Sequence, residues 1–114
     1  GARKTYQMDY RNSDQALQEI KADIKEGADQ IMIKPAHTYL DIIAKARIKF
    51  PEKTIAAYHV SGEYMAIKTL AEKGLVNEQE AFLEILSSIK RAGADWIITY
   101  YAPAINRMIK NRNF

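Results

Sequence analysis

Three residues with reactive or hydrogen-bonding side chains, Lys34, Ser61 and Tyr100, each follow a short, largely apolar run. If these runs are parallel strands, the three residues lie where strands end, which is the functional edge of α/β proteins. A lysine at the end of an apolar strand is partly desolvated, and this favours the neutral amine that attacks a carbonyl to form a Schiff base. The Ser61 hydroxyl, the backbone N–H groups beside Gly62 and the Tyr100 hydroxyl could together hold a carboxylate.

Each of these residues also has a plain structural interpretation. Lys34 can end a strand and extend its ammonium group into water. Ser61-Gly62 is a common turn, and the pair Tyr100-Tyr101 can consist of ordinary strand residues with one ring in the core. The residue types alone leave both interpretations open.

The two histidines, His37 and His59, are far apart in the sequence, and the chain has no cysteine. They therefore do not form a local set of metal ligands, and we expect both to be structural. Alternation along the strand places His59 on the side of Ser61, so His59 could also line a pocket there. The sequence contains no Walker loop, no His-Glu-x-x-His and no Gly-x-Ser-x-Gly.

The apolar periodicity predicts amphipathic helices that alternate with short buried strands. Helices are expected over residues 14–24, 39–50, 64–73, 78–92 and 104–110, and strands over residues 30–35, 54–60 and 95–101. Ser13 or Asp14 is the expected N-cap of the first helix, and Asn77 with Glu80 forms an N-cap pair for the fourth. Because the first strand is continuously apolar, we expect it to be buried on both faces.

A weak internal repeat supports this order of elements. Glu26-Gly27-Ala28-Asp29 stands before the first strand, as Ala92-Gly93-Ala94-Asp95 stands before the third. A recurring order of helix, glycine and strand predicts the α/β class, with parallel βα units and right-handed crossovers. Three to four such units are half of a (β/α)₈ barrel by count, and the glycine-rich turn of an open doubly wound sheet is absent.

Composition narrows the class of protein further. The 114 residues are 47% hydrophobic and 27% charged, which is typical of a globular domain or of part of a larger one. The net charge of +3 comes from alternating charges, so we expect no nucleic-acid partner. We also expect no membrane association and a cytoplasmic location, because the sequence lacks both a long apolar run and the pattern of a signal peptide.

Several stretches resemble the C-terminal part of the porphobilinogen synthase family, also called 5-aminolaevulinate dehydratase. They are Tyr6-Gln7-Met8-Asp9, residues 26–35, Tyr39-Leu40-Asp41-Ile42, residues 57–64 and residues 89–95. The resemblance implies that residues 1–114 are the C-terminal half of a single TIM-barrel catalytic domain whose N-terminal half is absent. It also implies a lyase of tetrapyrrole and haem biosynthesis, which condenses two molecules of 5-aminolaevulinate into porphobilinogen.

The resemblance also implies roles for individual residues. Lys34 matches the lysine that forms a Schiff base with one substrate, and Ser61 and Tyr100 match the pair that holds the carboxylate of that substrate. Arg3 matches an arginine that binds the carboxylate of the other substrate, and Gln7 matches a glutamine of the lid over the site.

The same resemblance implies which metal ions and partners the protein binds. Glu19 matches a glutamate that binds an activating, allosteric Mg²⁺ through water, and a further site for Zn²⁺ or Mg²⁺ belongs to the missing half. The family implies a homo-oligomer, an octamer at full length. Half a barrel also exposes strand edges and an apolar interior, so we expect it to need a partner or another copy of itself.

Two other functions are compatible with these residues. A truncated half-barrel could persist as a non-catalytic oligomerisation or interaction module. A different Schiff-base lyase on the same scaffold is the other alternative, which the run Tyr58-His59-Val60-Ser61-Gly62-Glu63 disfavours.

Overall fold

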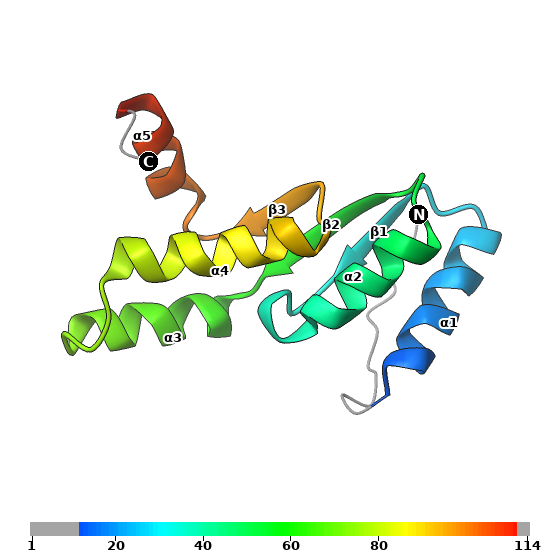
Figure 1. The fold of residues 1–114 in the computed structure, drawn as a ribbon, viewed down its shortest axis with the longest axis horizontal. Coiled ribbons are helices and arrows are strands. Elements are labelled where there is room, and N and C mark those ends of the chain that lie inside the picture. The colour runs from blue at the N-terminus through cyan, green and yellow to red at the C-terminus, as the bar shows by residue number, and fades with distance from the viewer. Residues whose placement is uncertain (1–11, 112–114) are drawn as a thin grey trace.

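The computed structural model describes residues 12–111, and the side chains of residues 12–107 (Figure 1). Helices and strands alternate along most of the chain. The elements are α1 (Ser13–Lys25), β1 (Gln30–Ile33), the 3₁₀ turn η1 (His37–Tyr39), α2 (Leu40–Lys49), β2 (Thr54–His59), α3 (Ser61–Glu72), α4 (Glu78–Ala92), β3 (Trp96–Thr99) and α5 (Ala102–Asn111). None of the helices in this part of the chain has the length and apolar character needed to cross a membrane.

The three strands form one parallel sheet in the order β1-β2-β3. Ile33 pairs with Ala57 in the first ladder, and His59 pairs with Thr99 in the second. The predicted α/β class with parallel βα units is therefore confirmed. The described residues hold three strands, one fewer than the four that half of an eight-stranded barrel would contain.

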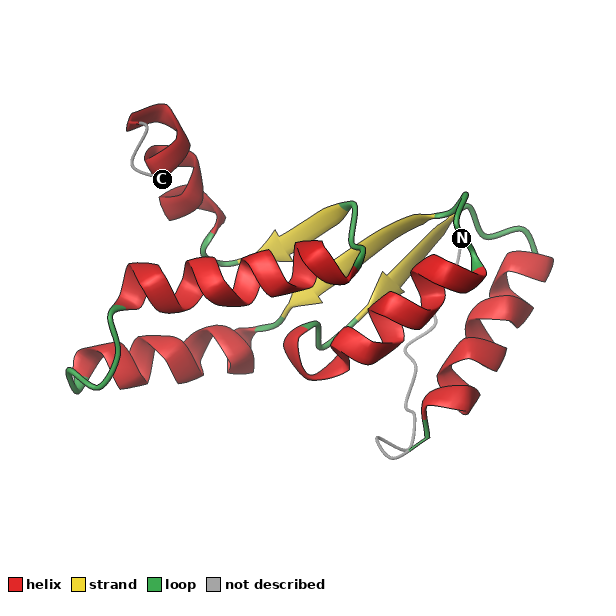
Figure 2. Ribbon diagram, viewed as in Figure 1, coloured by secondary structure: helices red, strands yellow, loops and turns green. Residues whose placement is uncertain are grey.

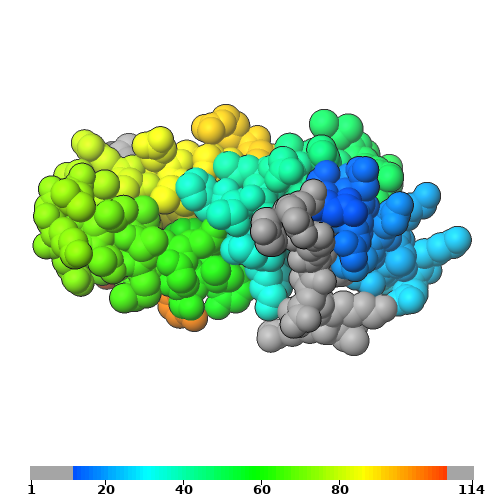
Figure 3. Space-filling model, turned by 90° about the horizontal axis from the view of Figure 1, so that it is seen from below, coloured from blue at the N-terminus to red at the C-terminus, as the bar shows by residue number. Residues whose placement is uncertain are grey.

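The helices cover one face of the sheet. In Figure 2, α2 and α4 lie in front of the strands, and Figure 3 shows α1 at one end of the molecule and α3 with α4 at the other. The largest fully buried side chains include Ile43 of α2, Ile55 of β2 and Phe82 of α4. Phe82 stacks on Tyr101 with ring centroids 3.9 Å apart. The hydrophobic core thus lies between the sheet and this helical layer.

The opposite face of the sheet is left largely open by the described residues. In β1, Ile31 and Ile33 are buried, whereas Gln30 and Met32 are exposed. Trp96 of β3, 66% exposed, lies on the same face as Met32, since both pair with Ala56 of the central strand. The prediction that the first strand is buried on both faces is wrong for this chain, because only Ile31 and Ile33, which face the helices, are buried.

Two predicted helix starts are also corrected. The N-cap of α1 is Asn12, not Ser13 or Asp14, and its side chain accepts a hydrogen bond from the Gln15 N–H (3.2 Å). Helix α3 begins at Ser61 and not at Tyr64, because the Glu63 carboxylate accepts the Val60 N–H (3.2 Å) and so stabilises an earlier first turn. The Asn77 cap is confirmed, with the Glu80 N–H donating to the Asn77 side chain (2.9 Å).

An arginine joins the amino ends of the strands to the helices that precede them. Arg47 of α2 donates to the Gly93 carbonyl through Nε (3.0 Å) and Nη2 (2.7 Å), and it forms an ion pair with Asp95. Asp95 also accepts the Ile55 N–H (2.9 Å), and this bond, together with Arg47, holds the pKa of its carboxyl below the ordinary value. The second copy of the Gly-Ala-Asp repeat therefore fixes β3 against β2 and α2.

Gly93 and Gly27 provide a matched test of this packing. Both have positive φ, +129° and +104°, but an added Cβ would lie 2.8 Å from the Arg47 Cβ at Gly93 and would contact nothing within 4 Å at Gly27. We expect Gly27→Ala to lower the free energy of unfolding by about 1–2 kcal/mol, the cost of a left-handed residue. Gly93→Ala should cost at least ~1 kcal/mol more, from overpacking. Urea denaturation followed by circular dichroism measures both, and equal losses would contradict the role of the Arg47 contact.

Candidate active site

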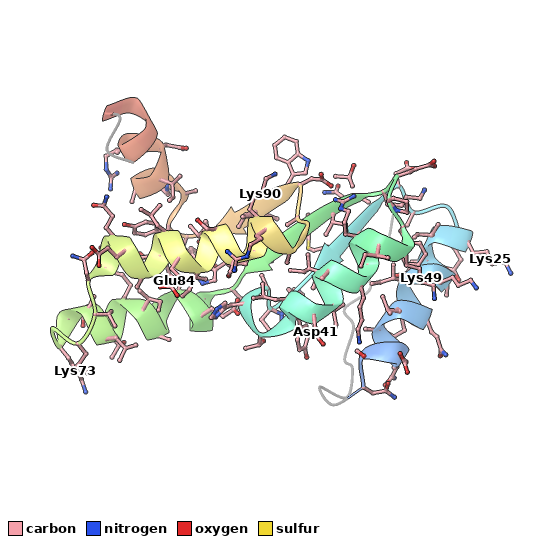
Figure 4. All side chains as sticks on the ribbon, viewed as in Figure 1. Lys25, Asp41, Lys49, Lys73, Glu84 and Lys90 are labelled. Atoms are coloured by element: carbon pink, nitrogen blue, oxygen red, sulfur yellow. The ribbon has the colours of Figure 1, made fainter. Side chains whose placement is uncertain are left out.

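The carboxyl ends of the three strands lie at one edge of the sheet, as their arrowheads in Figure 1 show. Lys34 directly follows β1, Ser61 follows β2 after one intervening residue, and Tyr100 directly follows β3. The structure therefore brings the three predicted residues to the same edge. Charged side chains elsewhere, such as Lys25 and Lys73, point outward from the helices (Figure 4).

Lys34 is exposed in this chain. It borders a hollow of about 10 Å³, room for roughly one water molecule, whose other lining residues are Ala16, Ile20, Met32, Ile33, Tyr39 and Ile42. The expected partial desolvation of the amine is thus wrong for this chain. The physical reason is that residues 30, 32 and 34 alternate onto the uncovered face of the sheet.

Ser61 is the first residue of α3, and its side chain is exposed. The first N–H groups of an α-helix have no partner within the helix, and the helix dipole makes this end favourable for anions. The hydroxyl of Ser61 and the N–H groups of the first turn of α3 can therefore act together on a carboxylate. Ser61-Gly62 therefore begins a helix and does not form the isolated turn that the Ser-Gly pair alone suggests.

Tyr100 is 54% exposed, and its hydroxyl lies 3.4 Å from the hydroxyl of Tyr58 on β2. This hydrogen bond raises the pKa of Tyr100, so the neutral phenol persists to higher pH and can donate to an anion. Tyr58 was not among the predicted site residues. The signal that could have found it is alternation along β2, which puts residue 58 on the opposite face from His59.

His59 is fully buried beneath this edge. Its Nδ1 lies 3.0 Å from the Thr99 hydroxyl, which also accepts the Tyr101 N–H (3.1 Å). Its Nε2 is buried and has no hydrogen-bond partner among the described residues, and the ring stands edge-on to Phe82. His59 thus links the ends of β2 and β3 from the helical side, which confirms the structural interpretation and not the pocket-lining one.

Burial lowers the pKa of His59, an effect that the Glu63 charge opposes and the His37 charge reinforces. The buried imidazole is therefore neutral around pH 7. It acts as a neutral spacer between the two strand ends that precede Ser61 and Tyr100.

The remaining predicted residues are not part of this edge as described. Arg3 and Gln7 lie outside the described residues. Glu19 is on α1, and its Oε2 is buried without a hydrogen-bond partner in the described part of the chain. No group of three or more His, Cys, Asp or Glu side chains that could hold a metal ion is found among residues whose side chains are described.

Comparisons with known proteins agree on one family. A family model described as delta-aminolevulinic acid dehydratase matches residues 1–108. The dehydratase of Archaeoglobus fulgidus is 54% identical over 105 residues, which are 92% of this chain and 32% of that protein. The dehydratase of Synechocystis sp. is 48% identical over 111 residues, 97% of this chain and 34% of that protein.

One solved structure is similar in both sequence and fold. It is the crystal structure of delta-aminolevulinic acid dehydratase (porphobilinogen synthase) from Toxoplasma gondii with the reaction product porphobilinogen. The TM-score is 0.86 at 50% identity, over 96% of this chain and 31% of that one. The chain thus spans about a third of the length of the relatives it matches.

The lowered pKa of His59 gives a pH dependence of stability. Because the folded state binds this proton less readily than the unfolded chain, stability is fully present above the ordinary pKa of 6.5 and is lost as pH falls below it. We expect urea denaturation to show a larger loss between about pH 7.5 and about pH 5.5 in the wild type than in His59→Gln. The exposed His37, changed to Gln, is the control and should keep most of the wild-type slope, because its charge is the smallest of the three influences on the pKa of His59. The same slope in all three proteins would contradict the assignment.

Proposed function

Because this chain belongs to the delta-aminolevulinic acid dehydratase family, we propose that the complete protein condenses two molecules of 5-aminolaevulinate into porphobilinogen, with Lys34 as the Schiff-base lysine. The observation that supports this most directly is the placement of Lys34, Ser61 and Tyr100 at one edge of three consecutive parallel strands. A Schiff-base lysine needs a neighbouring anchor that holds its ketone substrate in register, and Ser61 and Tyr100 have the chemistry for a carboxylate.

Lys34 acts on the ketone of the first substrate. Its neutral Nζ attacks the carbonyl carbon, the carbonyl oxygen leaves as water, and the product is an imine that gains a proton. The protonated imine withdraws electrons, so the adjacent carbon becomes acidic and the imine carbon becomes electrophilic. Bond formation with the second substrate then becomes feasible.

The two substrates are chemically identical, so the protein has to orient them differently. Ser61 and Tyr100 supply neutral donors for one carboxylate, with the Tyr58 hydroxyl adjacent to that of Tyr100. Arg3 supplies a guanidinium fork for the carboxylate of the other substrate, and Gln7 contributes to the lid over both. Different anchors thus give the two molecules different roles.

The open face of the sheet supports the proposal that this chain is part of a larger barrel. Met32, Trp96 and Ile98 expose apolar surface there, and β1 and β3 are edge strands of the described sheet. We assign residues 1–114 to the C-terminal portion of a TIM barrel, three of its eight strands, with this face turned inward. Such closure would also remove Lys34 from water, which the chain by itself does not do.

The carboxylate of Glu19 is a suitable ligand for a divalent cation. Its buried Oε2 lacks a partner among the described groups, and Mg²⁺ commonly keeps several waters while it binds one or two carboxylates. Glu19 would hold a hydrated, allosteric Mg²⁺ through its carboxylate. A second site, for Zn²⁺ or Mg²⁺, would lie in the rest of the barrel. Homo-oligomeric assembly and a cytoplasmic location stay predictions.

One observation favours the alternative function, a non-catalytic oligomerisation or interaction module. In this chain the Lys34 side chain and one face of the sheet are both exposed, as in a segment that docks on another surface. A trapping experiment distinguishes the two functions.

The trapping experiment uses a chimaera in which this chain replaces the matching third of the Archaeoglobus fulgidus relative. We expect borohydride reduction in the presence of 5-aminolaevulinate to leave one adduct per chain on Lys34, seen by peptide mass spectrometry, because reduction makes the imine permanent. Lys34→Met should abolish the adduct, and Lys49→Met, at an exposed helix end, should not. A folded chimaera without an adduct, or with one elsewhere, would favour the module.

The carboxylate anchor predicts an effect on KM. In the same chimaera we expect Ser61→Ala and Tyr100→Phe each to raise KM for 5-aminolaevulinate by roughly tenfold to a hundredfold, since a hydrogen bond to a charged group contributes about 1.5–3 kcal/mol. Ser87→Ala, on the exposed side of α4, is the matched control and should leave KM unchanged. Steady-state porphobilinogen formation measures all three, and an unchanged KM in both anchor variants would reject the assignment.

A further inference from the structure

A single carboxylate connects the two segments that hold Lys34 and Ser61. Glu63 of α3 accepts the Ala36 N–H at Oε1 (3.2 Å) and the His37 N–H at Oε2 (2.8 Å). Its Oε1 also accepts the Val60 N–H (3.2 Å). Three backbone donors from two loops therefore converge on one side chain.

These donors are close in sequence to the proposed catalytic groups. Ala36 is two residues after Lys34, and Val60 directly precedes Ser61. The Ala36 N–H also lies 3.0 Å from the Tyr58 carbonyl oxygen, so the chain after β1 continues along β2 past the last ladder pair. Glu63 closes this connection at the point where β1 and β2 have stopped pairing.

The geometry requires a carboxylate. An ionised carboxylate only accepts hydrogen bonds, and both oxygens of Glu63 face N–H donors. A glutamine in the same place would turn its NH₂ group toward at least one of these N–H groups and lose that bond. An aspartate keeps two acceptor oxygens but is shorter by one methylene, so it can retain only part of the connection.

We propose that Glu63 is a positioning residue, which sets the Lys34 amine against the Ser61 anchor by binding the two loops together. The inference rests on the proposed function, because the distance that it fixes is the one between the imine carbon and the carboxylate of one substrate. Glu63 itself touches no reacting atom. Loss of the Glu63 bonds leaves the Ala36–Tyr58 backbone bond in place but loosens the contact between the two loops. Misplacement of a reacting group by about 1 Å can slow a reaction ~100-fold.

The test follows the rate of Lys34 imine formation by rapid mixing with 5-aminolaevulinate and timed borohydride quenching in the chimaera. We expect Glu63→Gln to slow the rate constant at least tenfold and Glu63→Asp to recover part of the loss. Glu84→Gln, an exposed glutamate on α4 (Figure 4), is the matched control and should retain the wild-type rate. Circular dichroism gives the folded fraction, so that the rate constant refers to folded protein only.

The outcomes separate this inference from the proposed function. Rapid adduct formation in the wild type with a slow, folded Glu63→Gln supports both. Equal rate constants in the two proteins overturn the positioning role and leave the proposed function intact. A wild type that forms no adduct overturns the proposed function and the inference with it. If Glu63→Gln does not fold, Glu63→Asp takes its place, and a wild-type rate in that folded variant overturns the inference.

Discussion

Parallel pairing of three strands is the constraint on which the rest of this structure depends. The two ladders run in the same direction, so the residues that follow β1, β2 and β3 come to one edge without any contact between their side chains being needed. Each strand is then followed at that edge by one residue of the candidate site, Lys34 first, Ser61 next and Tyr100 last. The chemistry of the edge is thus set by topology, and its finer geometry by hydrogen bonds between neighbouring loops.

The amino ends and the carboxyl ends of the strands lie at opposite edges of the sheet, and the contacts at these two edges differ. At the amino edge, Arg47, Gly93 and Asp95 form a connected set of backbone and ionic contacts that fixes β3 beside β2. At the carboxyl edge, Ser61 and Tyr100 are exposed, His59 links the ends of β2 and β3, and Glu63 joins the loops that follow β1 and β2. A separation of this kind lets residues at the functional edge remain incompletely packed while the opposite edge supplies stability.

Much of the fold could be predicted because its signals are local. Asn77 with Glu80, the glycines 27 and 93 between helix and strand, and the spacing of apolar residues act within one helix or turn, and the structure has these elements in the predicted order. The start of α3 was harder to predict, because its N-cap Val60 has no side-chain acceptor to mark a helix start. The Glu63 carboxylate that accepts the Val60 N–H also binds Ala36 and His37, which are 27 and 26 residues away. That Lys34, Ser61 and Tyr100 meet at one edge of the sheet could be predicted from the sequence. The solvent exposure of Lys34 could not, since it depends on what covers the second face of the sheet.

The openness of that second face explains why the apolar sequence of β1 does not match the exposure of its residues. Gln30-Ile31-Met32-Ile33 has the composition of a strand with two buried faces, yet only the residues facing the helices are buried here. Ala56 of the central strand is buried between Met32 and Trp96 although it lies on the open side, because neighbouring strands shield a small side chain. Larger side chains on this face, Trp96 above all, remain in water, and their burial would be favourable by roughly 25 cal/mol per Å² of apolar surface. Closure of a barrel would therefore stabilise the fold and desolvate the lysine by covering the same surface, so that folding and activation of the amine would be one event.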